Sequence, residues 1–207
     1  MLRVLMGSLR SLLVFNPVPY VDSSSANAFR SKLDRALVGD ALIRDRQIAM
    51  IQPQRPQEGA PLYRVGCVGK IGEVQAMDDG RYNLILEGTT RFRMVRELDV
   101  TTAFRQIEAE IYDEDEDETL SHAQRGGFER EARRFADMQG YSVDWDSVER
   151  LDDRSLINGV SQIAPFDPAS KQALLEAETL TDRCELLVQL MQFYGRHDGG
   201  EEIVTLQ

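Results

Sequence analysis

The chain has 207 residues, of which 42% are hydrophobic, and a formal net charge of −11 at pH 7. That apolar content is enough to bury a core, whereas the negative charge disfavours nucleic acid and anionic membranes as partners. Cys67 and Cys184 are far apart in apolar patterns, and His122 and His197 stand in polar ones. No Cys/His spacing fits zinc, so we expect two buried thiols, no metal and no cofactor.

The N-terminal segment is apolar over residues 4–15, but Arg10 interrupts the run and Asn16 and Pro17 follow it. Residues 26–28 look like a small-residue cleavage site, so a signal peptide is the alternative to a first strand. We favour a strand at residues 12–15. No run of 18 or more apolar residues occurs, so we expect no membrane span and a cytoplasmic location.

The next elements are a helix and a strand. Phe29, Leu33, Ala36 and Leu37 have the spacing of one helix face, and residues 48–51 read as a strand.

Residues 62–95 predict a long antiparallel hairpin with one buried face. Tyr63, Val65, Cys67 and Ile71 alternate on one face, and the parity then changes, which predicts a bulge near Gly72. Residues 78–80 read Asp-Asp-Gly, a hairpin turn signal, and Phe92 and Met94 then alternate with arginines.

The start of this hairpin, Gly66-Cys67-Val68-Gly69-Lys70, resembles a phosphate-binding loop. Such a loop needs four residues between its glycines, a Ser or Thr after the lysine, and a helix start. Here two residues separate the glycines, Ile71 follows Lys70, and the strand period continues. We therefore expect no nucleotide site, and glycines that mark bends or close backbone approaches.

Six consecutive acidic residues occupy positions 113–118. Like charges repel and bury nothing, so we expect a solvated linker; the alternative is a docking site for a cation or a basic partner.

The remainder predicts helices. Asp167 and Pro168 are typical of a helix start, and Thr179 with Asp182 resembles a capping pair. The expected buried stripes are Phe128, Ala132 and Phe135; Trp145, Val148 and Leu151; Leu156, Val160 and Ile163; and Leu180, Cys184, Leu187 and Met191.

Four stretches together resemble the N-terminal domain of Lon-type ATP-dependent proteases, and more closely the free-standing bacterial proteins made of that domain alone. They read RALVGDALIRDRQIAMI, LYRVGCVGKIGEV, DGRYNLILEGTTRFRMV and IAPFDPASKQALLEAETLTDRCELLVQLMQF. The resemblance covers residues 35–193. Residues 8–34 keep little of the family's opening pattern, which either divergence or a shifted reading frame explains.

The resemblance implies an α+β fold, with a β-rich, antiparallel, barrel-like PUA-like lobe followed by an α-helical lobe. We expect the β lobe at residues 1–112, the acidic linker at 113–118, the helical lobe at 119–195 and a flexible tail at 196–207.

The implied function is non-enzymatic protein or peptide binding, as an adaptor or regulator in protein quality control. The implied partners are unfolded or tagged protein segments, or a protease or chaperone. No ATPase loop and no defensible peptidase nucleophile stands in the chain, so no catalytic residue is named.

No partner-binding residue is named either, because the apolar candidates Tyr63, Phe92, Met94 and Phe166 all fit core stripes. The alternative function is RNA binding through a PUA-like lobe. Its basic edge would consist of Arg91, Arg93 and Arg96, with Arg64 and Lys70 near it.

Overall fold

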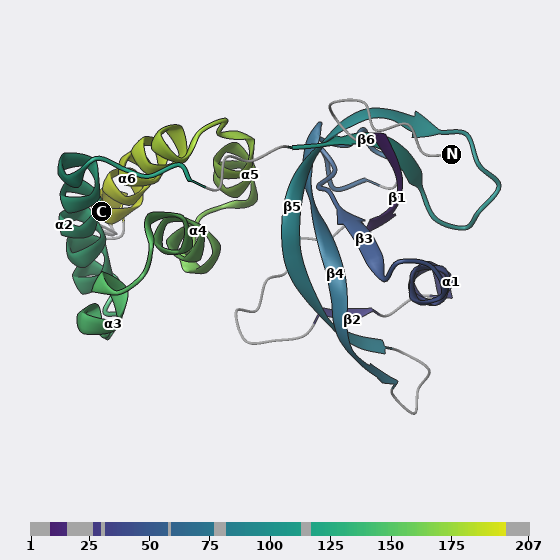
Figure 1. Ribbon diagram of the computed structural model, residues 1–207, viewed down its shortest axis with the longest axis horizontal. Helices are drawn as coiled ribbons and strands as arrows, with labels where there is room; N and C mark the ends of the chain where they lie inside the picture. The colour runs from purple at the N-terminus through teal and green to yellow at the C-terminus, as the bar shows by residue number, and fades with distance from the viewer. Residues whose placement is uncertain are drawn as a thin grey trace, which may run out of the picture. The chain divides into compact units, whose positions relative to one another are not determined.

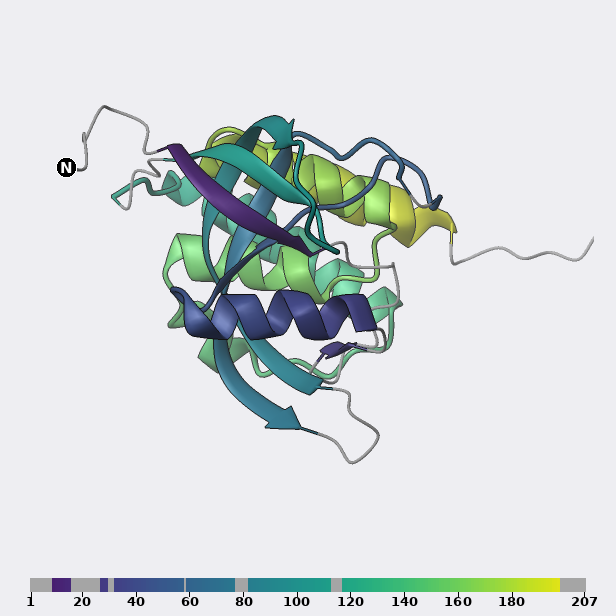
Figure 2. The same cartoon turned by 90° about the vertical axis from the view of Figure 1, so that its right-hand side faces the viewer.

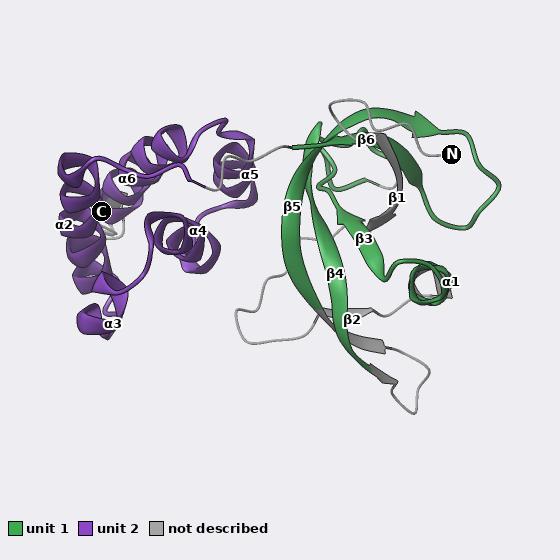
Figure 3. Cartoon of the chain, in the orientation of Figure 1, with its two compact units in different colours: residues 1–114 green, residues 115–207 purple. Residues whose placement is uncertain are grey.

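The chain divides into two compact units, residues 1–114 and residues 115–207 (Figure 3). We call them the β unit and the helical unit. The computed structural model describes residues 9–15, 27–29, 32–57, 59–76, 82–112 and 117–197. The predicted turn at 78–80, the acidic residues 113–116 and the tail beyond residue 197 lie outside these ranges.

The β unit is a curled sheet with one helix (Figures 1 and 2). Its strands pair in the order β2-β5-β4-β3-β1-β6, and β6 also pairs with β5, which closes the curl into a barrel. The elements are β1 (Leu9–Phe15), β2 (Asn27–Phe29), α1 (Lys32–Ile43), β3 (Gln47–Met50), β4 (Val65–Ala76), β5 (Tyr82–Leu98) and β6 (Gln106–Ile111).

The predicted fold class is confirmed, with two local differences. All strand pairs are antiparallel except β1 with β3, which run parallel. Phe29, which the helical spacing placed on the first helix, lies in β2 opposite Tyr82 of β5. Sequence spacing cannot distinguish a residue that starts a helix from one that ends the strand before it.

The β unit contains two buried clusters. The barrel cluster fills the curl of the sheet, and the α1 cluster joins one face of α1 to β3 and β4. The barrel cluster consists of Ala49, Ile51, Leu62, Val68, Phe92, Ile107 and Ala109; the α1 cluster consists of Leu37, Val38, Ala41, Ile48, Ile71 and Phe104.

The β4–β5 hairpin supplies side chains to both clusters and contains two register shifts. One shift lies between Ile71 and Val74, where the sequence predicted a bulge, and a second lies between Val68 and Gly69. Val68 points into the barrel cluster, and Ile71, three residues later and so on the opposite face of the strand, points into the α1 cluster. The hairpin is therefore buried on both faces and not on the single face that the sequence predicted. The second shift was not predicted. Cys67 directly precedes Val68 in β4, so it lies on the opposite face, where it is only half-buried, which corrects the expected buried thiol.

The helical unit contains α2 (His122–Met138), α3 (Trp145–Glu149), α4 (Asp153–Ile163), α5 (Pro168–Glu176) and α6 (Leu180–His197). Ser121, Asp144, Asp152 and Asp167 each accept a hydrogen bond from a backbone N–H in the first turn of the helix that follows. The predicted pair Thr179 and Asp182 exchange the same kind of bonds at the start of α6. These side chains satisfy donors that a helix cannot satisfy itself.

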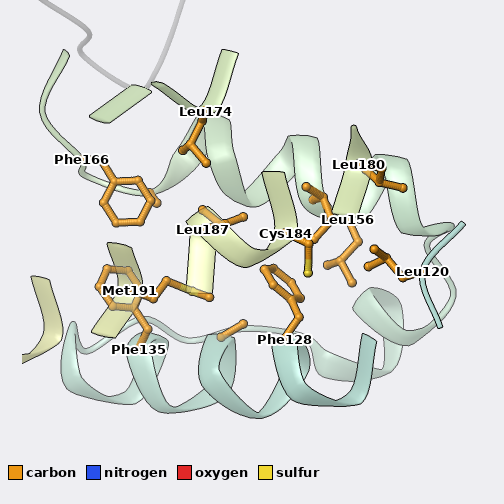
Figure 4. Close-up of a cluster of buried hydrophobic side chains, with 13 residues drawn as sticks. Leu120, Phe128, Phe135, Leu156, Phe166, Leu174, Leu180, Cys184, Leu187 and Met191 are labelled. Atoms are coloured by element: carbon orange, nitrogen blue, oxygen red, sulfur yellow. The ribbon is translucent and has the colours of Figure 1, made fainter. Parts of the chain in front are cut away.

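The core of the helical unit forms between α2 and α6, where Phe128 and Phe135 point toward Cys184, Leu187 and Met191 (Figure 4). The predicted stripes on α2 and α6 are therefore confirmed.

Two predicted core positions are wrong, because Leu151 and Ile163 are exposed. The helix α3 ends at Glu149, so Leu151 lies in the turn beyond it. On α4 the buried face runs through Leu156 and Ile157, and buried Ala164 follows directly after the helix. Ile163 falls outside that face and is 72% exposed.

We expect Leu187→Ala to lower the free energy of unfolding of the helical unit by about 2–5 kcal/mol, because its side chain is fully buried and the loss leaves a cavity. Ile163→Ala, the matched apolar truncation at the surface, should cost less than about 0.5 kcal/mol. Chemical denaturation followed by Trp145 fluorescence and far-UV circular dichroism measures both. Equal effects of the two substitutions would contradict the core assignment.

Candidate functional site

The aromatic and sulfur-containing candidates from the sequence are mainly core residues. Phe92 is fully buried in the barrel cluster, and Met94 packs against it. Phe166 is buried in the helical unit, with its ring centroid 5.9 Å from that of Phe135. Tyr63 is half-buried. None of these side chains therefore forms an open apolar surface by itself.

Exposed apolar side chains occur elsewhere, mostly on the helical unit. An isolated exposed apolar residue is ordinary, but several on one small unit give it apolar contact area. They are Met138, Tyr141, Leu151, Ile163 and Phe193.

Among these exposed side chains, Phe193 is the one that packs against other aromatic rings. It is 55% exposed, and its ring packs edge-on against Tyr194 at a centroid distance of 5.4 Å. The ring of Tyr194 in turn packs at a tilt against buried Phe166, with a centroid distance of 5.1 Å, and its hydroxyl accepts a hydrogen bond from the Asp167 backbone N–H at 3.2 Å. The exposed ring of Phe193 therefore packs on Tyr194, which is itself held by Phe166 and Asp167. Sequence periodicity missed Phe193 because it lies beside the buried stripe of α6.

The arginine edge is real, but its members already have partners. Both Arg91 and Arg93 lie over the ring of Tyr112, at 4.9 and 5.6 Å from its centroid. Arg93 also donates to the Tyr112 hydroxyl at 3.2 Å. Arg96 pairs with Glu108 at 2.6 Å. Arg91 is only 7% exposed, so it is not part of a solvated sheet face.

Arg64 and Lys70, the outlying members of the predicted basic edge, are exposed. Lys70 lies opposite Glu87 across the β4–β5 pair. The positive charge of this face is therefore balanced in part by neighbouring carboxylates, which reduces its attraction for a phosphate backbone.

The glycines of the loop-like sequence lie within β4, where no helix begins. A Cβ on Gly66 would meet the ring of Phe92 and lie 2.5 Å from the backbone oxygen of Met50. Gly66 is thus required by close packing inside the barrel, as the sequence interpretation anticipated.

We expect Gly66→Ala to destabilise the β unit by about 1–3 kcal/mol, because backbone and core must move to admit one methyl group. Gly39→Ala is the control: it lies within α1 with nothing within 4 Å of the added Cβ, and should be neutral or stabilise by up to about 1 kcal/mol. Thermal and urea unfolding distinguish the two. A neutral Gly66→Ala would mean that the barrel interior is loosely packed.

Glu118, the last residue of the acidic run, has a structural role. Its carboxylate accepts a hydrogen bond from the Leu180 backbone N–H at 2.8 Å, at the first residue of α6. Two residues later, the Leu120 N–H donates to Asp153 at 2.8 Å, and Arg125 pairs with the same carboxylate at 2.7 Å. The expectation that Glu118 is part of a solvated linker is therefore wrong. Its hydrogen-bond partner, Leu180, is 62 residues away in the sequence, so no local sequence pattern predicts this contact.

We expect Glu118→Ala to cost about 1 kcal/mol of stability in the helical unit, since a helix N-terminal donor loses its acceptor. Glu118→Gln keeps an acceptor oxygen and should cost less than half as much. Asp137→Ala, which removes an exposed carboxylate near the end of α2, should be neutral or slightly stabilising. Urea denaturation of the three variants checks this. A loss for Asp137→Ala as large as that for Glu118→Ala would point to general charge effects.

The described residues contain no group of three or more His, Cys, Asp or Glu side chains that could hold a metal ion. Burial raises the pKa of the Cys184 thiol to about 11, so this thiol stays protonated at neutral pH. Among the described helices, none is long and apolar enough to cross a membrane.

Comparison with protein families gives a match over residues 22–192 to the model described as the ATP-dependent protease La (LON) substrate-binding domain. Among curated proteins, Lon protease 2 of Desulfotalea psychrophila is 29% identical over 179 residues. That alignment covers 78% of this chain but 22% of the relative, so the chain spans less than a quarter of that protein's length.

Two solved structures share the fold. The N-terminal domain of the Mycobacterium avium complex Lon protease superposes with a TM-score of 0.65 at 18% identity, covering 88% of this chain and 98% of the other. A Lon N-terminal domain protein from Xanthomonas campestris gives a TM-score of 0.65 at 17% identity, covering 87% and 98%.

Proposed function

Since this chain belongs to the ATP-dependent protease La (LON) substrate-binding domain family, we propose that it binds unfolded or tagged segments of other proteins. The family match over residues 22–192 is the observation that carries this proposal. We further propose a role as an adaptor or regulator in protein quality control in the cytoplasm, acting beside a protease or a chaperone.

The surface of the helical unit supports the proposal. Unfolded chains are distinguished from folded ones by their exposed apolar side chains, which need apolar contacts on the protein that binds them. Phe193 and Ile163 offer such contacts from α6 and α4, and Phe193 is supported by the ordered rings below it. A ring that is already fixed in place loses little conformational entropy on binding.

The proposal is one of binding without turnover. The matched region is the substrate-binding domain, and no ATPase or peptidase domain is matched in this chain. Fold alone does not carry catalysis, which requires a nucleophile, a base and their geometry.

RNA binding remains the alternative function. The stacked arginines and Tyr112 are the observation that bears on it, since aromatic rings and guanidinium groups also stack on bases. Against this, Arg91 is buried, Arg96 is paired with Glu108, and the net charge of the chain is −11.

We expect the protein to bind a fluorescently labelled, reduced and carboxymethylated polypeptide saturably, with the folded form of the same polypeptide unable to compete. The double variant Ile163→Ser/Phe193→Ser should weaken binding by roughly ten-fold. Ile43→Ser, which removes an exposed apolar side chain at the end of α1, is the matched control and should leave the affinity unchanged. Fluorescence anisotropy measures all of these.

Absence of binding to the unfolded polypeptide would refute the proposed function. A labelled single-stranded RNA, titrated at several salt concentrations, tests the alternative. Salt-sensitive binding of RNA without binding of the unfolded polypeptide would favour an RNA-binding role.

A further inference from the structure

Met138, an exposed methionine at the end of α2, lies against a glycine of α6. Met138 is the last residue of α2, and 42% of it is exposed. A Cβ built on Gly195 would overlap the terminal methyl group of Met138 and would lie 3.4 Å from its sulfur atom. The thioether of Met138 therefore packs on the backbone of the last turn of α6.

Close packing is the reason for glycine at position 195. Glycine weakens a helix relative to alanine, so a glycine inside α6 needs a cause. Gly195 is not among the glycines with a positive φ, so its backbone conformation does not require glycine. What the missing side chain provides is room for the methyl group of Met138.

The contact lies at one end of the core between α2 and α6. Phe135, one turn before Met138 on α2, lies beside Met191 of α6 (Figure 4). A ring carbon of Phe135 is also 3.9 Å from the Cβ position at Gly195. Met138 thus extends the buried contact of the two helices to their ends, where its sulfur atom lies at the surface of the unit.

We propose that Met138 is an oxidation-sensitive clamp, whose conversion to the sulfoxide by a peroxide releases the last turn of α6 from α2. In this step the sulfur atom takes one oxygen atom from hydrogen peroxide, as an S–O bond forms and the O–O bond breaks. The peroxide leaves as water. The sulfur atom loses two electrons, and the peroxide gains them.

The sulfoxide fits this contact poorly, because oxidation turns an apolar side chain into a polar one beside an aromatic ring. The end of α2 is fixed by backbone hydrogen bonds, from the Gln139 N–H to the Phe135 carbonyl at 3.0 Å and from the Tyr141 N–H to the Ala136 carbonyl at 2.9 Å. We therefore expect the last turn of α6 to be the part that loosens.

Exposure distinguishes Met138 from the other methionines that the structure describes. Met191 is fully buried, and Met50 and Met94 are half-buried. Since oxidation follows solvent access, Met138 should react before these three.

The clamp acts next to the surface that we propose binds unfolded chains. Phe193 packs edge-on against Tyr194, and Tyr194 directly precedes Gly195. A looser last turn would hold the Phe193 ring less firmly, so binding would have to order it at a cost in conformational entropy. This consequence rests on the proposed function: oxidation of Met138 weakens the binding of unfolded segments.

The test treats the full chain with hydrogen peroxide and follows each methionine by peptide mass spectrometry. We expect the sulfoxide to form about ten-fold faster at Met138 than at Met191. Oxidation of Met138 should speed amide hydrogen exchange at residues 193–196 by about ten-fold. Fluorescence anisotropy with the carboxymethylated polypeptide should show binding weakened by about three-fold.

Two variants separate Met138 from the other methionines of the chain. Met138→Leu keeps an apolar side chain of similar size without the sulfur atom, so peroxide should change neither its exchange at residues 193–196 nor its affinity. Met138→Gln places a polar group at the contact and should reproduce both changes without peroxide.

The outcomes distinguish the clamp from the proposed function. Oxidation of Met138 no faster than that of Met191, or unchanged exchange at residues 193–196 after oxidation, would overturn the clamp. An equal response to peroxide in Met138→Leu would also overturn it. Faster exchange with unchanged affinity would refute the effect on binding. If the unoxidised protein does not bind the carboxymethylated polypeptide, the proposed function fails, and the exchange measurement still decides whether the clamp exists.

Discussion

The β unit depends on the pairing of β4 with β5. A strand places successive side chains on opposite faces, so a hairpin that is covered on both sides can serve two cores. Here one face of the hairpin supplies Val68 and Phe92 to the barrel cluster, and the other face supplies Ile71 to the α1 cluster. The long β5 then pairs with β2, β4 and β6.

Much of this architecture could be predicted from the sequence where the cause is local. The predicted buried stripe on α6 is confirmed, because a long helix repeats its apolar period often enough for the pattern to be recognised in the sequence. The caps at Asp167 and Thr179 are confirmed because a cap needs only the residues beside it. The bulge near Gly72 was visible as a change of parity in the apolar pattern.

What could not be predicted depends on distant partners or on the exact end of an element. The role of Glu118 requires α6 to begin beside it, and the burial of Arg91 requires Tyr112 to lie under its guanidinium group. Ile163 fitted a helical apolar period. However, the buried side of α4 is the one that continues to Ala164, just after the helix, so Ile163 is exposed.

The bonds that start the helical unit have a mechanical consequence. The chain enters this unit at residues 117–120, where Glu118 holds the start of α6 and the Leu120 N–H is held by Asp153 of α4. Tension applied through the connecting segment would first reach these hydrogen bonds, and they tie the entry point to two separate helices. A force applied from the N-terminal side would therefore act on α4 and α6 through these two hydrogen bonds. It would reach the start of α2 only after both bonds had broken.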